Sequence, residues 1–270
     1  MSASTSIYRR VLIPIDLTPG SQAKAPAVRR IIDTRDTEIT LLHVVEPKPW
    51  SGHAGHTLRL MNELEILAQR QYRGAGLVRR IEWGRPADCI LGVLRSGGAD
   101  VVLMTAAPVG ADPVGPVANE VLAEAPCPVL LDWPATHPTN QARVQPVCCA
   151  VEWDGNEARV LREAVRVAEC CEAPLIVLGA ATRERDAAAL RARAGEFLRH
   201  AAPEAELQVE AGHPGAAIRR ALRFHGAGLL VAGGSRDVLL AAEGECAVLY
   251  TGCQEQAAAV GFEFAARRSA

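Results

Sequence analysis

The sequence contains few aromatic residues, little net charge and no long apolar run. Phe, Trp and Tyr make up 4% of its 270 residues, which is too few for the stacking platforms of single-strand nucleic-acid binders. The formal net charge of −2 gives no basic footprint for nucleic acid. No apolar stretch reaches the ~18 residues of a membrane span, and the first ten residues do not resemble a signal peptide. We therefore expect a cytoplasmic protein with no nucleic-acid partner and no membrane insertion.

None of the eight cysteines belongs to a C-x-x-C pair. Two pairs are immediate neighbours in sequence, and neighbours on a strand point to opposite faces. In a reducing compartment we expect all eight to be free and structural. His43, His53 and His56 lie close in sequence, but a structural zinc site takes four ligands. The sequence predicts no metal site.

One pattern of strands and helices occurs twice along the chain. Apolar and β-branched runs predict buried strands. In the first half these are 11–15, 38–45, 77–83, 100–104 and 128–131, with helices at 21–32, 58–73, 87–95 and 117–125. In the second half the strands are 147–151, 174–178, 207–211, 228–232 and 247–250, with helices at 157–170, 186–200 and 216–224. Alternating strands and helices imply parallel sheets covered on both faces.

Two alignments relate the halves to each other. Val11–Asp16 matches Val147–Glu152, so an acidic residue ends the first strand of each half. The Gly-x-Pro at residues 84–86 matches the Gly-x-Pro at residues 212–214. Such a series is hard to obtain twice by chance, so the chain is predicted to be a tandem repeat.

The region between the repeats is rich in Pro, Thr, Asn and Gln and has no periodicity, which is typical of a linker. We predict domains at 1–133 and 146–252, a linker at 134–145 and a tail at 253–270. Val260–Phe264 in the tail would add an edge strand, pack on a partner or fray. The two halves are expected to pack through their fifth strands, near Val129 and Val248, because short apolar edge strands need covering.

Five segments of the first half resemble the universal stress protein family. They are Val11–Ser21, Thr40–Glu46, Gly84–Ile90, Ala99–Met104 and Val117–Leu131. The resemblance covers nearly all of the first half, and the second half is assigned mainly through the repeat. It implies a tandem member with two doubly wound α/β domains, each with five parallel strands in the order 3-2-1-4-5. It also implies that the halves pair as a pseudo-dimer, like two subunits of single-domain members.

A ligand site is expected where the strand order reverses, at the carboxyl ends of strands one and four. Asp16 follows the first strand there. The resemblance implies that the matching acid of ATP-binding members meets the adenosine part, beside the residues that match Pro14 and Val44. The alternative is that Asp16 only caps a turn. The other candidate site residues are Met104, which ends the fourth strand, and Gly115 and Val117, which come after it.

The phosphate loop of ATP-binding members is degenerate here. Those members carry Gly-x2-Gly-x9-Gly-Ser/Thr, but Thr105 and Pro108 replace the first two glycines and Pro116 replaces the hydroxyl residue. Phosphates need closely approaching backbone N–H groups, and proline has none. In the second half Glu152 replaces the aspartate, Arg236 replaces the second glycine, and the gap before the last strand is too short for the loop and a full helix.

The sequence thus predicts a non-catalytic binding or regulatory protein of the stress response, with no cofactor and no tight ATP binding. No nucleophile is accompanied by a recognisable base, so no catalytic residue is predicted. One alternative is a stress protein that binds ATP or AMP in the first-half cleft and hydrolyses ATP slowly. Another is an accessory module that docks on a transporter or kinase. A homodimer and an unidentified protein partner both stay open.

Overall fold

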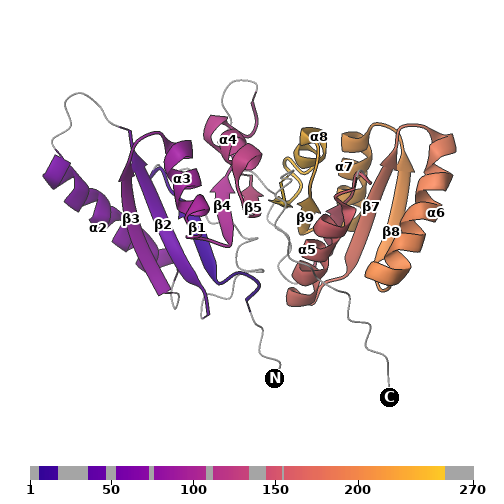
Figure 1. Cartoon of the computed structure of the whole chain (residues 1–270), viewed down its shortest axis with the longest axis horizontal. Helices are drawn as coiled ribbons and strands as arrows, with labels where there is room; N and C mark the ends of the chain where they lie inside the picture. The colour runs from indigo at the N-terminus through magenta and orange to yellow at the C-terminus, as the bar shows by residue number, and fades with distance from the viewer. Residues whose placement is uncertain are drawn as a thin grey trace, which may run out of the picture.

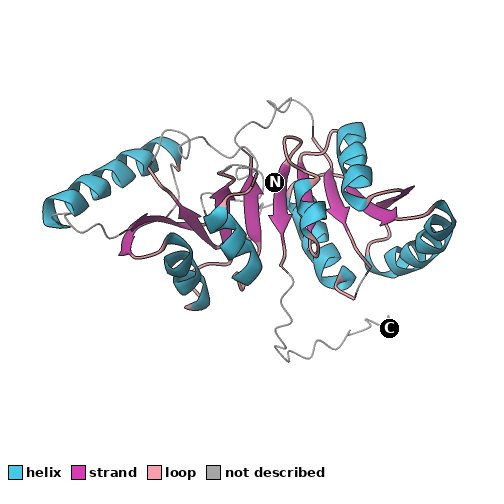
Figure 2. Cartoon of the chain, turned by 90° about the horizontal axis from the view of Figure 1, so that it is seen from above, coloured by secondary structure: helices cyan, strands magenta, loops and turns pink. Residues whose placement is uncertain are grey.

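The computed structural model describes residues 6–17, 36–46, 53–72, 76–107, 112–133, 144–153 and 155–252. These residues form one ten-stranded sheet with helices on both faces (Figure 1, Figure 2). The predicted helix at 21–32, the tail at 253–270 and most of the predicted linker lie outside the described residues. In the described part of the chain, no helix is both long and apolar enough to cross a membrane.

The first half builds one side of the sheet. Its strands are β1 (Arg10–Pro14), β2 (Glu38–Val45), β3 (Gly76–Trp83), β4 (Val101–Thr105) and β5 (Val129–Asp132). Its helices are α2 (His53–Gln71), α3 (Pro86–Arg95) and α4 (Pro116–Glu124). Both α3 and α4 begin with proline, whose missing N–H is not needed in the first turn of a helix. The strand order β3-β2-β1-β4-β5 confirms the predicted topology.

The second half repeats this order as β8-β7-β6-β9-β10. Its strands are β6 (Val147–Ala150), β7 (Leu175–Ala181), β8 (Glu206–Ala211), β9 (Leu229–Ala232) and β10 (Ala247–Tyr250). Its helices are α5 (Glu157–Cys170), α6 (Glu184–Ala201), α7 (Pro214–His225) and α8 (Arg236–Leu240). The sequence analysis did not predict α8. This short helix lies between β9 and β10, in the gap that is too short for a phosphate loop and a full helix.

The halves meet at a seam formed by β5 and β10. These two strands pair antiparallel, with Val129 opposite Tyr250, Leu130 opposite Leu249 and Leu131 opposite Val248. We predicted packing between two separate sheets, whereas the fifth strands hydrogen-bond and join the sheets into one. Pairing satisfies the open N–H and C=O groups of both edges, which side-chain covering alone would leave unpaired.

Two apolar layers, one on each face of the sheet, run through both halves. One layer contains Val11 and Leu130 from the first half with Cys149 and Leu249 from the second. The other layer likewise joins residues of both halves across the seam. The core is therefore continuous, although the topology is that of two repeats.

Further contacts between the halves lie at the N-terminal end of β1. The Tyr8 hydroxyl donates a hydrogen bond to Glu163 of α5. Arg166 of α5 contacts Glu163 at 2.9 Å and donates to the carbonyl oxygen of Ile7 at 3.3 Å. The side chain of Tyr8 is buried, so this contact belongs to the shared core.

The neighbouring residues Cys148 and Cys149 point to opposite faces of β6, as predicted, and each enters one of the two apolar layers. They and Cys246 are buried. Burial raises the pKa of Cys148 to about 12 and also raises the pKa of Cys149 and of Cys246. Because the thiolate is the reactive form, these three thiols should be inert in the folded protein.

We expect thiol titration of the denatured protein to report all eight cysteines as free. In the native protein, Cys148, Cys149 and Cys246 should stay unmodified for as long as the fold persists. Mass spectrometry of the alkylated protein before and after denaturation checks both statements. Fewer than eight thiols in denaturant, with the protein kept from air, would reveal a disulfide or a bound metal.

Candidate functional site

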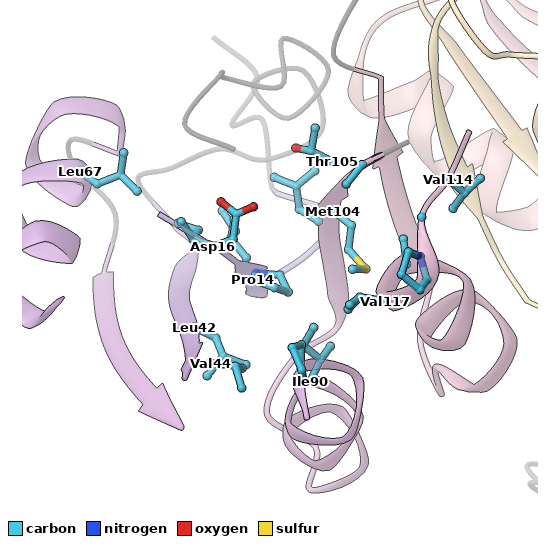
Figure 3. A pocket seen from close by; sticks show the side chains of 18 of the residues that line it. Pro14, Asp16, Leu42, Val44, Leu67, Ile90, Met104, Thr105, Val114 and Val117 are labelled. Atoms are coloured by element: carbon cyan, nitrogen blue, oxygen red, sulfur yellow. The ribbon is translucent and has the colours of Figure 1, made fainter. Parts of the chain in front are cut away.

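A cavity of about 330 Å³ opens at the carboxyl ends of β1 and β4 (Figure 3). The strand order reverses at this place, since β1 lies between β2 and β4. All six candidate residues from the sequence line this cavity: Pro14, Asp16, Val44, Met104, Gly115 and Val117. The structure therefore brings together side chains from three strands, α4 and the loop before it.

Most of the cavity wall is apolar. Leu42 of β2, Ile90 of α3 and Val114 before α4 are almost completely buried in it. Leu67 and Tyr72, at the end of α2, also line the cavity, and they belong to the apolar layer on the other face of the sheet. These residues were not named as site residues, because an apolar position on a strand or helix looks like core in a sequence. The wall suits an apolar part of a ligand.

Asp16 and Thr105 bring polar groups to the same rim of the cavity (Figure 3). Asp16 is exposed and Thr105 is half-buried. Among the described residues that line the cavity, Asp16 alone carries a charge. A carboxylate accepts hydrogen bonds and donates none, so this rim suits ligand hydroxyl or amino groups better than anions.

Two backbone N–H groups just after β4 are bound to carbonyl oxygens of the chain itself. The N–H of Ala106 donates to Asp132 at 2.7 Å, and the N–H of Ala107 donates to Val114 at 3.0 Å. Gly115 has φ of +91°, and a Cβ there would overlap the carbonyl oxygen of Ala107. Glycine is thus needed at this position to close the loop on itself, and not to leave donors open for a phosphate.

The carboxylate of Asp112 takes the N–H groups just before α4. It accepts hydrogen bonds from the N–H of Val114, at 3.2 Å, and from the N–H of Gly115. The side chains of Asn119 and Arg236 also donate to it. Partial burial acts to raise the pKa of Asp112, but these donors outweigh burial and hold it below its usual value. A helix N-terminus attracts an anion, and here the chain supplies that anion itself.

Sequence reasoning did not select Asp112. The available signal was an aspartate a few residues before a helix, which is typical of capping. The sequence analysis compared only the glycine and hydroxyl positions of the phosphate loop, and Asp112 is not one of them. Pro108, at the second glycine position, lies outside the described residues.

The second half shows the same arrangement with a different acid. Glu152, which follows β6, accepts the N–H of Ser235 at 2.9 Å and also the Ser235 hydroxyl. Gly234 has φ of +88°, and a Cβ there would overlap this carboxylate. The acid that aligns with Asp16 is therefore bound to the turn between β9 and α8. In each half a carboxylate of the chain occupies N–H groups after the fourth strand.

The described residues give no support to a metal site. They contain no group of three His, Cys, Asp or Glu side chains placed to hold an ion. His43 lies on β2, and its Nδ1 is 2.7 Å from the carbonyl oxygen of Ile15. The side chains of His53 and His56 lie outside the described residues, so the prediction about this histidine group stays untested.

The fold is similar to those of several solved structures. A universal stress protein from Archaeoglobus fulgidus has a TM-score of 0.68 and 19% identity, with 90% of this chain and 98% of that chain covered. A putative universal stress protein from Pseudomonas aeruginosa has a TM-score of 0.59 and 19% identity, covering 91% and 94%. The cytoplasmic domain of a prokaryotic cation chloride cotransporter has a TM-score of 0.50 and 15% identity, covering 90% and 94%. At these identities the similarity shows the fold alone.

Among curated proteins, none matches this chain in sequence. Residues 7–131 match the model of the universal stress protein family. The matched range contains β1 to β4, most of β5 and the cavity, and the second half repeats the same strand order. The first half of the chain is thus similar to the universal stress protein family.

Proposed function

We propose that this chain is a cytoplasmic, non-catalytic binding protein of the stress response, and that its first-half cavity takes a nucleoside such as adenosine rather than ATP. The observation that carries the proposal is the Asp112 carboxylate at the start of α4, where it already holds the N–H groups of Val114 and Gly115. A triphosphate would have to displace this acid before it could use those donors.

Charge supports the same choice of ligand. A hydrogen bond that involves a charged group contributes roughly 1.5–3 kcal/mol. An ATP site needs several such bonds. The described cavity residues include no basic side chain, and the carboxylate of Asp16 would repel phosphate oxygens. An uncharged nucleoside avoids this repulsion, while its hydroxyl groups can donate to Asp16.

The same features argue against phosphoryl transfer. That chemistry depends on positioning of the phosphates and on stabilisation of their charge. The described rim offers Asp16 and Thr105, neither of which is a cation. We therefore favour a role in which a bound ligand changes how the protein interacts with a partner, over the alternative of slow ATP hydrolysis.

Thermal unfolding with added ligands tests this proposal. A ligand at one hundred times its dissociation constant stabilises a fold by about 2.7 kcal/mol. We expect millimolar adenosine to raise the melting temperature by several degrees, and Mg-ATP at the same concentration to leave it unchanged. Asp16→Asn should abolish the adenosine shift. Asp88→Asn, which changes an exposed acid of α3 that does not line the cavity, serves as the matched control.

Calorimetry is the measurement that can reject this proposal. A micromolar dissociation constant for Mg-ATP that is lost in Asp16→Asn would reject the nucleoside proposal and favour the ATP-binding alternative. Binding of neither ligand by the wild-type chain would reject adenosine as the ligand of the cavity.

A further inference from the structure

We propose that Arg236 is a positioning residue through which the second half holds the wall of the first-half cavity. The inference rests on the proposed function in that this cavity is the one assigned to the ligand. Arg236 is the first residue of α8, and its Nη2 lies 2.6 Å from Oδ1 of Asp112. The two residues are 124 positions apart and belong to different halves.

On the first-half side, Asp112 organises part of the cavity wall. Its carboxylate holds the N–H groups of Val114 and Gly115, and both residues line the cavity. Val114 is completely buried, and its carbonyl oxygen accepts the N–H of Ala107, another lining residue. A displacement of Asp112 would therefore move several lining residues together.

On the second-half side, the turn that presents Arg236 is held from two strands. Glu152, just after β6, binds the N–H and the hydroxyl of Ser235. The hydroxyl of Tyr250, on β10, donates to the carbonyl oxygen of Gly234 at 2.6 Å. Arg236 thus extends from a turn tied to the sheet, and its planar guanidinium can keep a defined geometry toward a carboxylate.

These contacts form a continuous path from the second half to the cavity. The path runs from Glu152 through Ser235 and Arg236 to Asp112, and from there to Val114. Both partners of the Arg236–Asp112 pair are partly exposed, and such pairs contribute little to global stability. Loss of the pair should therefore loosen the cavity wall without lowering the melting temperature appreciably.

Amide hydrogen exchange of the full chain tests this role. In Arg236→Ala we expect the amides of Val114 and Gly115 to exchange about tenfold faster than in the wild type, and Arg236→Lys should restore part of the protection. Arg220→Ala is the matched control. Arg220 forms a similarly exposed pair with Glu210 inside the second half, and its loss should leave both amides unchanged. Wild-type exchange at these amides in Arg236→Ala would overturn the proposal.

Adenosine titration of the same variants separates this inference from the proposed function. We expect Arg236→Ala to weaken adenosine binding several-fold and Arg220→Ala to leave it unchanged. If the wild type fails to bind adenosine, the proposed ligand is wrong, and the exchange measurement still decides the role of Arg236. If adenosine binds equally well to Arg236→Ala and to the wild type, Arg236 does not position the ligand site.

Discussion

Replacing Leu249 with Asp should prevent the whole chain from folding, and not the second half alone. Leu249 lies in the seam opposite Leu130, and both side chains are completely buried in the same apolar layer. Loss of a buried leucine costs about 2–5 kcal/mol, and an unpaired buried carboxylate costs several more. The sum is comparable to the total stability of a folded protein, about 5–15 kcal/mol.

A milder variant measures the same coupling. Leu249→Ala should lower the free energy of unfolding by about 2–5 kcal/mol, and both halves should still melt in one transition, because their apolar layers are continuous. Val78→Asp on the edge strand β3 is the control, since Val78 is 41% exposed. It should change stability by no more than about 1 kcal/mol. Calorimetry in which only one half of Leu249→Ala melts early would contradict a shared core.

The second large effect concerns Asp132, the last residue of β5. Its side chain is buried, and burial raises its pKa to about 6, although the N–H of Trp133 partly offsets this. The folded state therefore holds the proton more tightly than the unfolded state, where the pKa is near 4. Stability should fall as the pH rises from about 4 to about 6, by roughly 3 kcal/mol, and stay low above that window.

We expect Asp132→Asn to remove this loss, so that it stabilises the protein at pH 8 and has little effect at pH 4. Asp100→Asn provides a control of opposite sign. Partial burial acts to raise the pKa of Asp100, but hydrogen bonds from Arg10 and Arg9 lower it. The stabilisation by Asp100 is therefore present at neutral pH and is lost as the pH falls through its folded pKa. Urea unfolding at both pH values distinguishes the two carboxyls, and a gain at pH 4 for Asp132→Asn would disprove the assignment.

Most of the fold could be predicted from local pattern, because buried strands of a parallel sheet are short apolar runs with clear punctuation. β2 at Glu38–Val45 and β10 at Ala247–Tyr250 were predicted with their observed bounds. The joining of the two sheets was not predicted. An edge strand can be covered by side chains or hydrogen-bonded to another strand. Both arrangements place the same apolar residues at the interface, so composition does not distinguish them.

The candidate site was predicted only in part. Position at the end of a strand identified Asp16, and the resemblance added the residues beside it. The roles of Asp112 and Arg236 depend on contacts across many residues of sequence, which no local pattern contains. In the sequence, Arg236 stands out only as the replacement of a glycine, and the structure pairs it with Asp112. The sequence showed that Glu152 replaces the aspartate of the first half. Its hydrogen bond to Ser235 depends on the turn at Gly234, which only the structure shows.

The seam also determines how amino-acid substitutions can make the two halves differ from each other. In a symmetric dimer of identical subunits, every substitution on the fifth strand would occur twice. It would therefore change both sides of the interface at once. Here Val129 faces Tyr250 at one end, and Leu131 faces Val248 at the other. The bond from Tyr250 to Gly234 serves one half alone. Because one chain carries both strands, their pairing is intramolecular and independent of protein concentration. Each side of the interface can therefore specialise through single changes, while dilution leaves the sheet intact.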